Sequence, residues 1–111
     1  MNLHDTVTRL RAPLISSGYG NVDRDWANAT SQDFSIRWSF KTWTEVVGGE
    51  ERTVTGGSIF GGPDLDLLAT DRVIYQGETY EIAGDVVPSM DGRGALHHYR
   101  ARTRRIALAG T

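Results

Sequence analysis

The stretch Phe34-Ser35-Ile36-Arg37-Trp38-Ser39-Phe40-Lys41 decides the fold of this chain. Apolar side chains alternate in it with serine, arginine and lysine. Successive side chains of a strand point to opposite faces, so this alternation predicts a strand with one buried face and one solvent-exposed face. We expect Trp38 and Phe40 on the buried face, in the core of the domain.

Other segments rich in β-forming residues lie on both sides of this strand, at about 6–10, 72–75, 79–82, 86–87 and 95–107. Segments 72–75 and 79–82 enclose Gly77 and predict a hairpin. The turn residues at 91–94 predict a second pairing, between 86–87 and the long segment from 95 to 107. The chain of 111 residues is long enough for one core. We expect a single all-β domain over 1–111, a small antiparallel β-barrel or sandwich.

Two long stretches, 12–32 and 45–64, do not have the pattern of regular structure. Six of the 13 glycines fall in the second stretch, which predicts a long glycine-rich loop. Loops of this length are uncommon in a small domain unless they bind something or are ordered by a neighbour. Both loops are therefore candidate interaction segments.

Composition narrows the class of protein. Hydrophobic residues are 39% of the chain and charged residues 23%, as in globular domains. The absence of cysteine excludes disulfides and thiolate chemistry. No apolar run approaches the ~20 residues of a membrane span, and the first residues lack a signal-peptide pattern. We therefore expect no membrane association.

The net charge of −2 hides a segregation of charge along the chain. From Glu45 to Asp91, ten acidic residues stand against two arginines, a net charge of −8. From Gly92 to Thr111, five arginines stand with no acidic residue, a net charge of +5. Such blocks can pair within a chain, pair between copies, or present a basic face to a polyanion.

The search for a catalytic or metal site finds none. His97 and His98 are adjacent and would point to opposite faces of their strand, so they cannot share one metal there. No HExxH, GxSxG or P-loop motif is present. Asp64 and Asp66 could act as paired carboxylates if they lay on a strand, but a solvated acidic loop is the favoured interpretation. We expect no enzyme activity, no cofactor and no metal.

Arg100, Arg102 and Arg104 recur at a spacing of two, which aligns three guanidinium groups on one face of the last strand. One interpretation is an exposed edge strand kept soluble by its charge. A second is a nucleic-acid contact, and a third, which fits the charge blocks best, is pairing with acidic residues of another copy. The apolar anchor of such an interface would be Trp26, Trp43, Ile59 or Phe60.

Several segments, in this order, resemble a known family. They are Val7-Thr8-Arg9-Leu10-Arg11-Ala12-Pro13, Tyr19-Gly20-Asn21, Asp25-Trp26, Asp71-Arg72-Val73 and Gly77-Glu78-Thr79-Tyr80-Glu81-Ile82. Together they are similar to the head-closure proteins of long-tailed bacteriophages, which are also called head-to-tail stoppers or head-tail connectors. One departure is that the proline-rich start of the family's middle loop is absent here.

This resemblance implies a small β-barrel without enzyme activity, made in the host cytoplasm and assembled as a homo-oligomeric ring in the neck of the virion. The ring would join the portal and adaptor to the tail terminator and retain the packaged double-stranded DNA. By position, the channel loop of the family corresponds to about 45–63, where the gating residues would be Glu45, Gly48, Gly49, Glu50, Glu51, Gly56 and Gly57.

In that role, acidic loop residues would repel the DNA backbone, and the flanking glycines would let the loop swing. Subunit or partner contacts would fall on Trp26, Trp43, Phe60, Arg100, Arg102 and Arg104. The alternative function is a monomeric β-barrel that binds nucleic acid through the C-terminal arginine strand.

Overall fold

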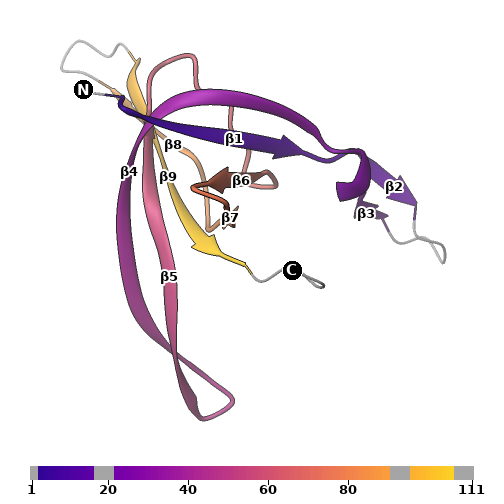
Figure 1. Ribbon diagram of the computed structural model, residues 1–111, viewed down its shortest axis with the longest axis vertical. Helices are drawn as coiled ribbons and strands as arrows, with labels where there is room; N and C mark the ends of the chain where they lie inside the picture. The colour runs from indigo at the N-terminus through magenta and orange to yellow at the C-terminus, as the bar shows by residue number, and fades with distance from the viewer. Residues whose placement is uncertain (1–2, 17–21, 91–95, 107–111) are drawn as a thin grey trace.

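The alternating stretch lies in the longest strand of the computed structural model, β4 (Thr30–Val47) (Figure 1). The structure describes residues 3–16, 22–90 and 96–106. Apart from a 3₁₀ turn, η1 (Trp26–Asn28), its regular elements are strands. The other strands are β1 (Asp5–Arg11), β2 (Leu14–Ser16), β3 (Val22–Arg24), β5 (Glu50–Gly61), β6 (Arg72–Tyr75), β7 (Glu78–Ile82), β8 (Val87–Met90) and β9 (Leu96–Arg105).

The main sheet closes on itself. Its strand order is β5-β4-β1-β6-β7-β9-β8, and β5 also pairs with β9, so six strands form a closed ring. β8 lies on the same edge of β9 as β7 but pairs with the earlier part of that strand. Every pairing is antiparallel. The predicted all-β antiparallel barrel is therefore confirmed.

The barrel encloses an aromatic and aliphatic core. Ile36 and Ile59 are fully buried, and the indole of Trp38 stacks on the ring of Tyr75 with centroids 4.3 Å apart. Tyr80 meets the indole edge-on at 4.7 Å. Offset-stacked and edge-to-face pairs of this kind add about 0.5–1.5 kcal/mol each to the gain from burial. The alternation at 34–38 thus predicted the buried face correctly.

Phe40 is a correction to that prediction. It follows Trp38 on the same side of β4 and touches the rings of Trp38 and Tyr75, yet 56% of its surface is exposed. The reason is that β1 pairs with β4 only as far as Ile36. Beyond Ile36, β4 has no β1 residue beside it. Phe40 therefore covers the end of the core instead of lying inside it.

The expected irregular loop at 45–64 is wrong, because most of this stretch is strand. β4 and β5 pair without interruption from Ile36↔Gly61 to Val47↔Glu50. Gly48 and Gly49 form the two-residue turn, with φ values of 60° and 83°, as a type I′ turn requires. The outer part of this hairpin projects well beyond the barrel (Figure 1).

Gly56 and Gly57 are strand residues that permit close approach and do not break the strand. A Cβ at Gly57 would lie 2.6 Å from Nε1 of Trp38, and one at Gly56 would collide with the carbonyl oxygen of Thr103. Because both positions are packed, the base of the hairpin is fixed to the barrel. The predicted hinge at these two glycines therefore has no structural basis.

The stretch 12–32 is also more ordered than predicted. β2 and β3 form a separate two-stranded sheet that extends from the end of β1 (Figure 1). The amide of Asp25 donates to the carbonyl of Pro13 at 2.8 Å, and Arg24 donates to the carbonyl of Ala12 at 3.1 Å. These bonds tie the small sheet to the last residues before it.

The remaining strand predictions hold. β6 and β7 form the predicted hairpin around Gln76 and Gly77, and β8 pairs with β9 as expected. The turn predicted at 91–94 lies outside the described residues. In the part of the chain that is described, no helix is long and apolar enough to span a membrane.

Candidate interaction surface

The outward side chains of β4, β5 and β9 form one continuous face, because the registers of these strands bring them into rows. Arg37 and Arg100 flank Phe60, and Lys41 and Arg104 flank Gly56. Ala101 and Thr103 are buried between the arginines of β9, so the predicted alternation of that strand is confirmed. We call this surface the basic face and define it by Arg37, Lys41, Trp43, Phe60, Arg100, Arg102 and Arg104.

Arg104 is neutralised within the chain. Its guanidinium lies 2.9 Å from one carboxylate oxygen of Glu45 and donates to the other at 3.2 Å. The indole N–H of Trp43 donates to the same carboxylate at 3.0 Å. The hairpin stem and β9 are therefore joined by a charged cluster, and Arg104 is not available as a free cation.

Other cations of the basic face lack a carboxylate partner. In the described part of the chain, Lys41, Arg100 and Arg102 make no ion pair within 4.0 Å. Arg37 lies over the ring of Phe60, with its guanidinium carbon 4.7 Å from the centroid. This places an aromatic ring among the cations, as a cation–π contact.

Two hollows open beside Arg102. The first has a volume of about 420 Å³ and is lined by Lys41, Trp43, Ser58, Ala83 and Arg102, among others. The second has a volume of about 270 Å³ and shares Ala83 and Arg102 with the first. Its other walls come from Gly84, Asp85, Val87 and Arg100.

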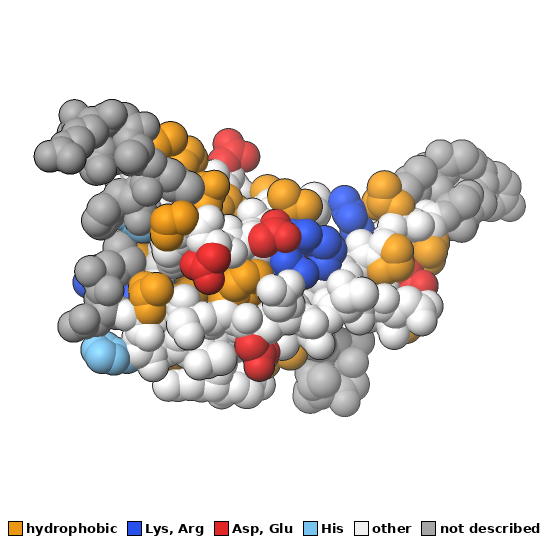
Figure 2. Space-filling view, turned by 90° about the horizontal axis from the view of Figure 1, so that it is seen from above, with side chains coloured by type: hydrophobic (Ala, Val, Ile, Leu, Met, Phe, Trp, Pro, Cys, Tyr) orange, Lys and Arg blue, Asp and Glu red, His pale blue; other side chains and the backbone are white. Residues whose placement is uncertain are grey.

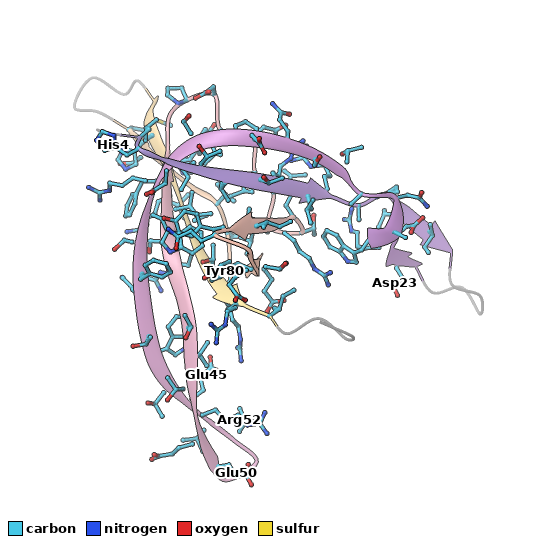
Figure 3. The ribbon with its side chains drawn as sticks, viewed as in Figure 1. His4, Asp23, Glu45, Glu50, Arg52 and Tyr80 are labelled. Carbon is cyan, nitrogen blue, oxygen red and sulfur yellow. The ribbon has the colours of Figure 1, made fainter. Side chains whose placement is uncertain are left out.

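The tip of the β4–β5 hairpin carries four of the seven predicted channel residues, Gly48, Gly49, Glu50 and Glu51, whereas Glu45 lies on the stem and Gly56 and Gly57 lie at the base. Figure 3 shows Glu45 on the stem and Glu50 and Arg52 near the tip. Val46 is 69% exposed, and Glu50 and Glu51 are exposed as well. Glu50 makes only a long contact of 3.9 Å with Arg52. The tip is thus both apolar and acidic.

A second charged cluster fastens the connection 62–71 to β1. Arg11 donates to both oxygens of Asp71, at 3.0 and 2.9 Å, and to both oxygens of Asp66, at 3.2 Å. Arg9, which is buried, donates to the carbonyl and the carboxylate of Asp66. The hydrogen bond from Arg11 is the main reason that the pKa of Asp66 is lowered.

The favoured interpretation of Asp64 and Asp66, an exposed acidic loop, is confirmed, because both residues are exposed. Residues 62–71 form no strand, so the two aspartates do not share a strand face. Asp66 is in addition an ion-pair partner of Arg9 and Arg11, and its side chain stays 60% exposed. The face in Figure 2 accordingly mixes acidic, basic and apolar side chains, without an extended patch of one charge.

Trp26 lies apart from the basic face. The guanidinium of Arg72 sits over its ring, 4.0 Å from the centroid. Five of the six predicted interface residues therefore share one surface and the sixth does not. Three of the segments that carry the family resemblance nevertheless meet, because Arg11 binds Asp71 and Arg72 covers Trp26. The segment Tyr19-Gly20-Asn21 lies outside the described residues.

Arg37 and Lys41 are the residues of the basic face that sequence reasoning missed. Their alternation with Ile36 and Trp38 placed them on the exposed side of a strand, but nothing in the sequence paired that strand with the arginine strand. Among the described residues, no group of three or more His, Asp or Glu side chains could hold a metal ion. The side chain of His97 lies outside the description.

Of the comparisons with known proteins, only the one with solved structures finds a similar protein. No family model matches the chain, and no curated protein matches it. Among solved structures, the phage-like element PBSX protein xkdH from Bacillus subtilis is similar, with 9% sequence identity and a TM-score of 0.49. The match covers 91% of this chain and 92% of that protein.

Proposed function

We propose that this chain is a virion structural protein without enzyme activity, a head-to-tail stopper that forms a ring in the phage neck. The observation that supports this most is the projecting β4–β5 hairpin. It extends beyond the barrel where the family resemblance places the channel loop, and it ends in the exposed acids Glu50 and Glu51.

The geometry suggests how such a hairpin would act on DNA. Acidic side chains at a narrow point of the channel would repel the phosphate backbone, so DNA would be blocked or guided without sticking. Because Gly56 and Gly57 are packed against the barrel, the base of the hairpin would move with its subunit. Opening and closing would then be a rotation of subunits and not the swing of a loop.

The ring also needs surfaces for assembly. Head-to-tail rings use two different patches on each subunit. The basic face, with Trp43, Phe60, Arg100 and Arg102, is one such patch and would contact another subunit, the portal and adaptor, or the tail terminator. Exposed ion pairs contribute about 0–1 kcal/mol each, so they would set the register of assembly more than its strength.

The test is to replace Val46–Glu51 with Asn-Gly. The new turn would follow the Glu45↔Arg52 pair, so the Glu45–Arg104 cluster stays intact. We expect the barrel to fold, while particles lose packaged DNA or fail to join tails. The matched control replaces only Gly48-Gly49 with Asn-Gly, which keeps the hairpin length. Normal infectious particles from the shortened variant would refute the channel role.

A second candidate function is supported by the basic face itself. A monomeric barrel that binds nucleic acid would use Lys41, Arg100 and Arg102 on the phosphates. Affinity for DNA would then fall steeply with salt, and removing one arginine would lower the salt slope by about one unit. A salt titration with a short duplex separates this function from the ring protein, which should bind DNA weakly.

A further inference from the structure

Arg102 belongs to a group of cations that have no carboxylate partner among the described residues. Arg9, Arg11 and Arg104 all pair with carboxylates, at distances of 2.9–3.2 Å. Lys41, Arg100 and Arg102 have no ion pair in the described part of the chain, although they share one face, with Lys41 on β4 and the two arginines on β9, on either side of β5. Unpaired like charges held close together are a cost unless an anion binds them.

The three cations line the two hollows beside Arg102. Lys41 and Arg102 line the first, with the indole of Trp43 as an apolar wall. Arg100 and Arg102 line the second. With volumes of about 420 and 270 Å³, each hollow has room for side chains. Interface anchors bind in pockets of this kind.

The spacing of the cations fits an extended peptide. Arg100 and Arg102 are two residues apart on a strand, a distance of about 6.6 Å. Acidic side chains at every second position of an extended chain present carboxylates at the same spacing on one side. Each guanidinium can bind a carboxylate through two hydrogen bonds, which fixes the orientation of the peptide.

The surroundings disfavour a nucleic-acid backbone. Asp85 is part of the second hollow, and the carboxylate of Glu45 lies beside Trp43 at the first. A phosphate backbone would be repelled by these acids, whereas single carboxylates can enter the hollows between them. A duplex also binds best to a continuous basic surface, and here the row ends at Arg104, which Glu45 neutralises.

We propose that the basic face is a docking site for an acidic, extended segment of another protein. One carboxylate lies between Lys41 and Arg102, and a second lies at Arg100. The proposal rests on the proposed function for the identity of this partner as a neighbouring protein of the particle. The binding chemistry is a property of the purified chain alone.

The experiment measures binding of a labelled peptide of eight alternating glutamate and threonine residues to the full chain, by fluorescence anisotropy. The control peptide has glutamine in place of glutamate. We expect the acidic peptide to bind and the control peptide to bind at least tenfold more weakly. Arg102→Glu should weaken binding of the acidic peptide at least tenfold, and Arg102→Gln less. Arg105→Glu is the matched control, because Arg105 is exposed on the same strand outside the two hollows, and it should leave binding nearly unchanged.

Three results would overturn the proposal. The first is equal binding of the acidic peptide by the wild type and Arg102→Glu, with both folded by near-ultraviolet circular dichroism. The second is tighter, Arg102-dependent binding of a 20-base-pair duplex, which would assign the face to nucleic acid. The third is concentration-dependent self-association that Arg102→Glu abolishes, which would assign the face to a second copy.

These outcomes are separable from failure of the proposed function. The variant with Asn-Gly in place of Val46–Glu51 keeps the whole basic face, so it should bind the acidic peptide normally. If the chain is absent from virions but binds the peptide, the stopper role fails and the docking site stands. If the chain occupies the neck but does not bind the peptide, the docking site is refuted and the stopper role is kept.

Discussion

At the scale of single residues, Arg11 binds the carboxylates of both Asp66 and Asp71. It neutralises Asp71, whose side chain is 1% exposed, and its own pKa is raised, chiefly by the hydrogen bond to Asp71. Asp71 in turn accepts a hydrogen bond from the amide of Leu68, which shapes the connection to β6. The pair therefore holds a connecting segment against β1.

Replacing Arg11 with alanine should lower the free energy of unfolding by about 3 kcal/mol. The reason is that a buried carboxylate would be left without its partner, which typically costs 3–5 kcal/mol. Urea denaturation followed by tryptophan fluorescence measures the change. Arg52→Ala is the control, since its ion pair is 3.9 Å long and exposed, and we expect a change below about 0.5 kcal/mol. Equal losses in both variants would contradict this account.

Asp66 makes a pH-dependent contribution to stability. Its pKa in the folded protein is lowered from the usual 3.8, first by the hydrogen bond from Arg11 and then by the charges of Arg11 and Arg9. A lowered pKa means that the stabilisation is complete above the unfolded value and is lost as pH falls through the folded value.

The stability difference between the wild type and Asp66→Asn should therefore be constant near neutral pH and shrink below about pH 4. Because the Asp66 side chain is 60% exposed, the difference should not exceed about 1 kcal/mol. Urea denaturation of both proteins at a series of pH values measures it. A difference that grows on acidification would mean that Asp66 is stabilised in its protonated form.

At the scale of elements, the packing of β5 into the barrel wall between β4 and β9 depends on glycine. Gly57→Ala would place a methyl group 2.6 Å from Nε1 and 2.7 Å from Cε2 of Trp38, and we expect a loss of about 1–3 kcal/mol. Gly62→Ala is the control, because its Cβ would meet only the movable Asp64 carboxylate at 3.1 Å and, more distantly, Leu3. Thermal unfolding of both variants gives the comparison. A Gly57→Ala protein as stable as the wild type would show that Trp38 can move.

The same glycines explain how far the sequence could predict the elements. Alternation of apolar and polar side chains identified β4 over 34–38, and the turn at Gln76-Gly77 identified the β6–β7 hairpin. The six glycines of 45–64 predict a loop, whereas β5 runs through three of them, Gly56, Gly57 and Gly61. What Gly56 and Gly57 do depends on Thr103 and Trp38, which reach them through strand register that no local pattern encodes.

The candidate surface was predictable to the same extent. The spacing of Arg100, Arg102 and Arg104 was sufficient to place them on one face. The partners of that face were not predictable, because Arg37 and Lys41 join it only through the registers of β4, β5 and β9. Likewise, Glu45 of the acidic block 45–91 pairs with Arg104 of the basic block 92–111 within one chain, and the sequence did not distinguish this from pairing between copies.

At the scale of the whole molecule, two arms extend from a small barrel. The radius of gyration of the Cα atoms is 15.6 Å, and the principal extents are 48 × 34 × 25 Å. A compact domain of this length would have a radius of gyration of about 13 Å. The excess comes from the β4–β5 hairpin and the β2–β3 sheet, which leave the barrel in different directions (Figure 1).

A free two-stranded arm is marginally stable in water, so whether the hairpin stands away from the barrel in an isolated subunit can be measured. Small-angle X-ray scattering of the monomer at low concentration should give a larger radius of gyration for the wild type than for the variant with Asn-Gly in place of Val46–Glu51. The comparison cancels the contribution of hydration, which is common to both proteins. If the two radii are equal, the hairpin folds back onto its own barrel when alone, and only assembly would extend it.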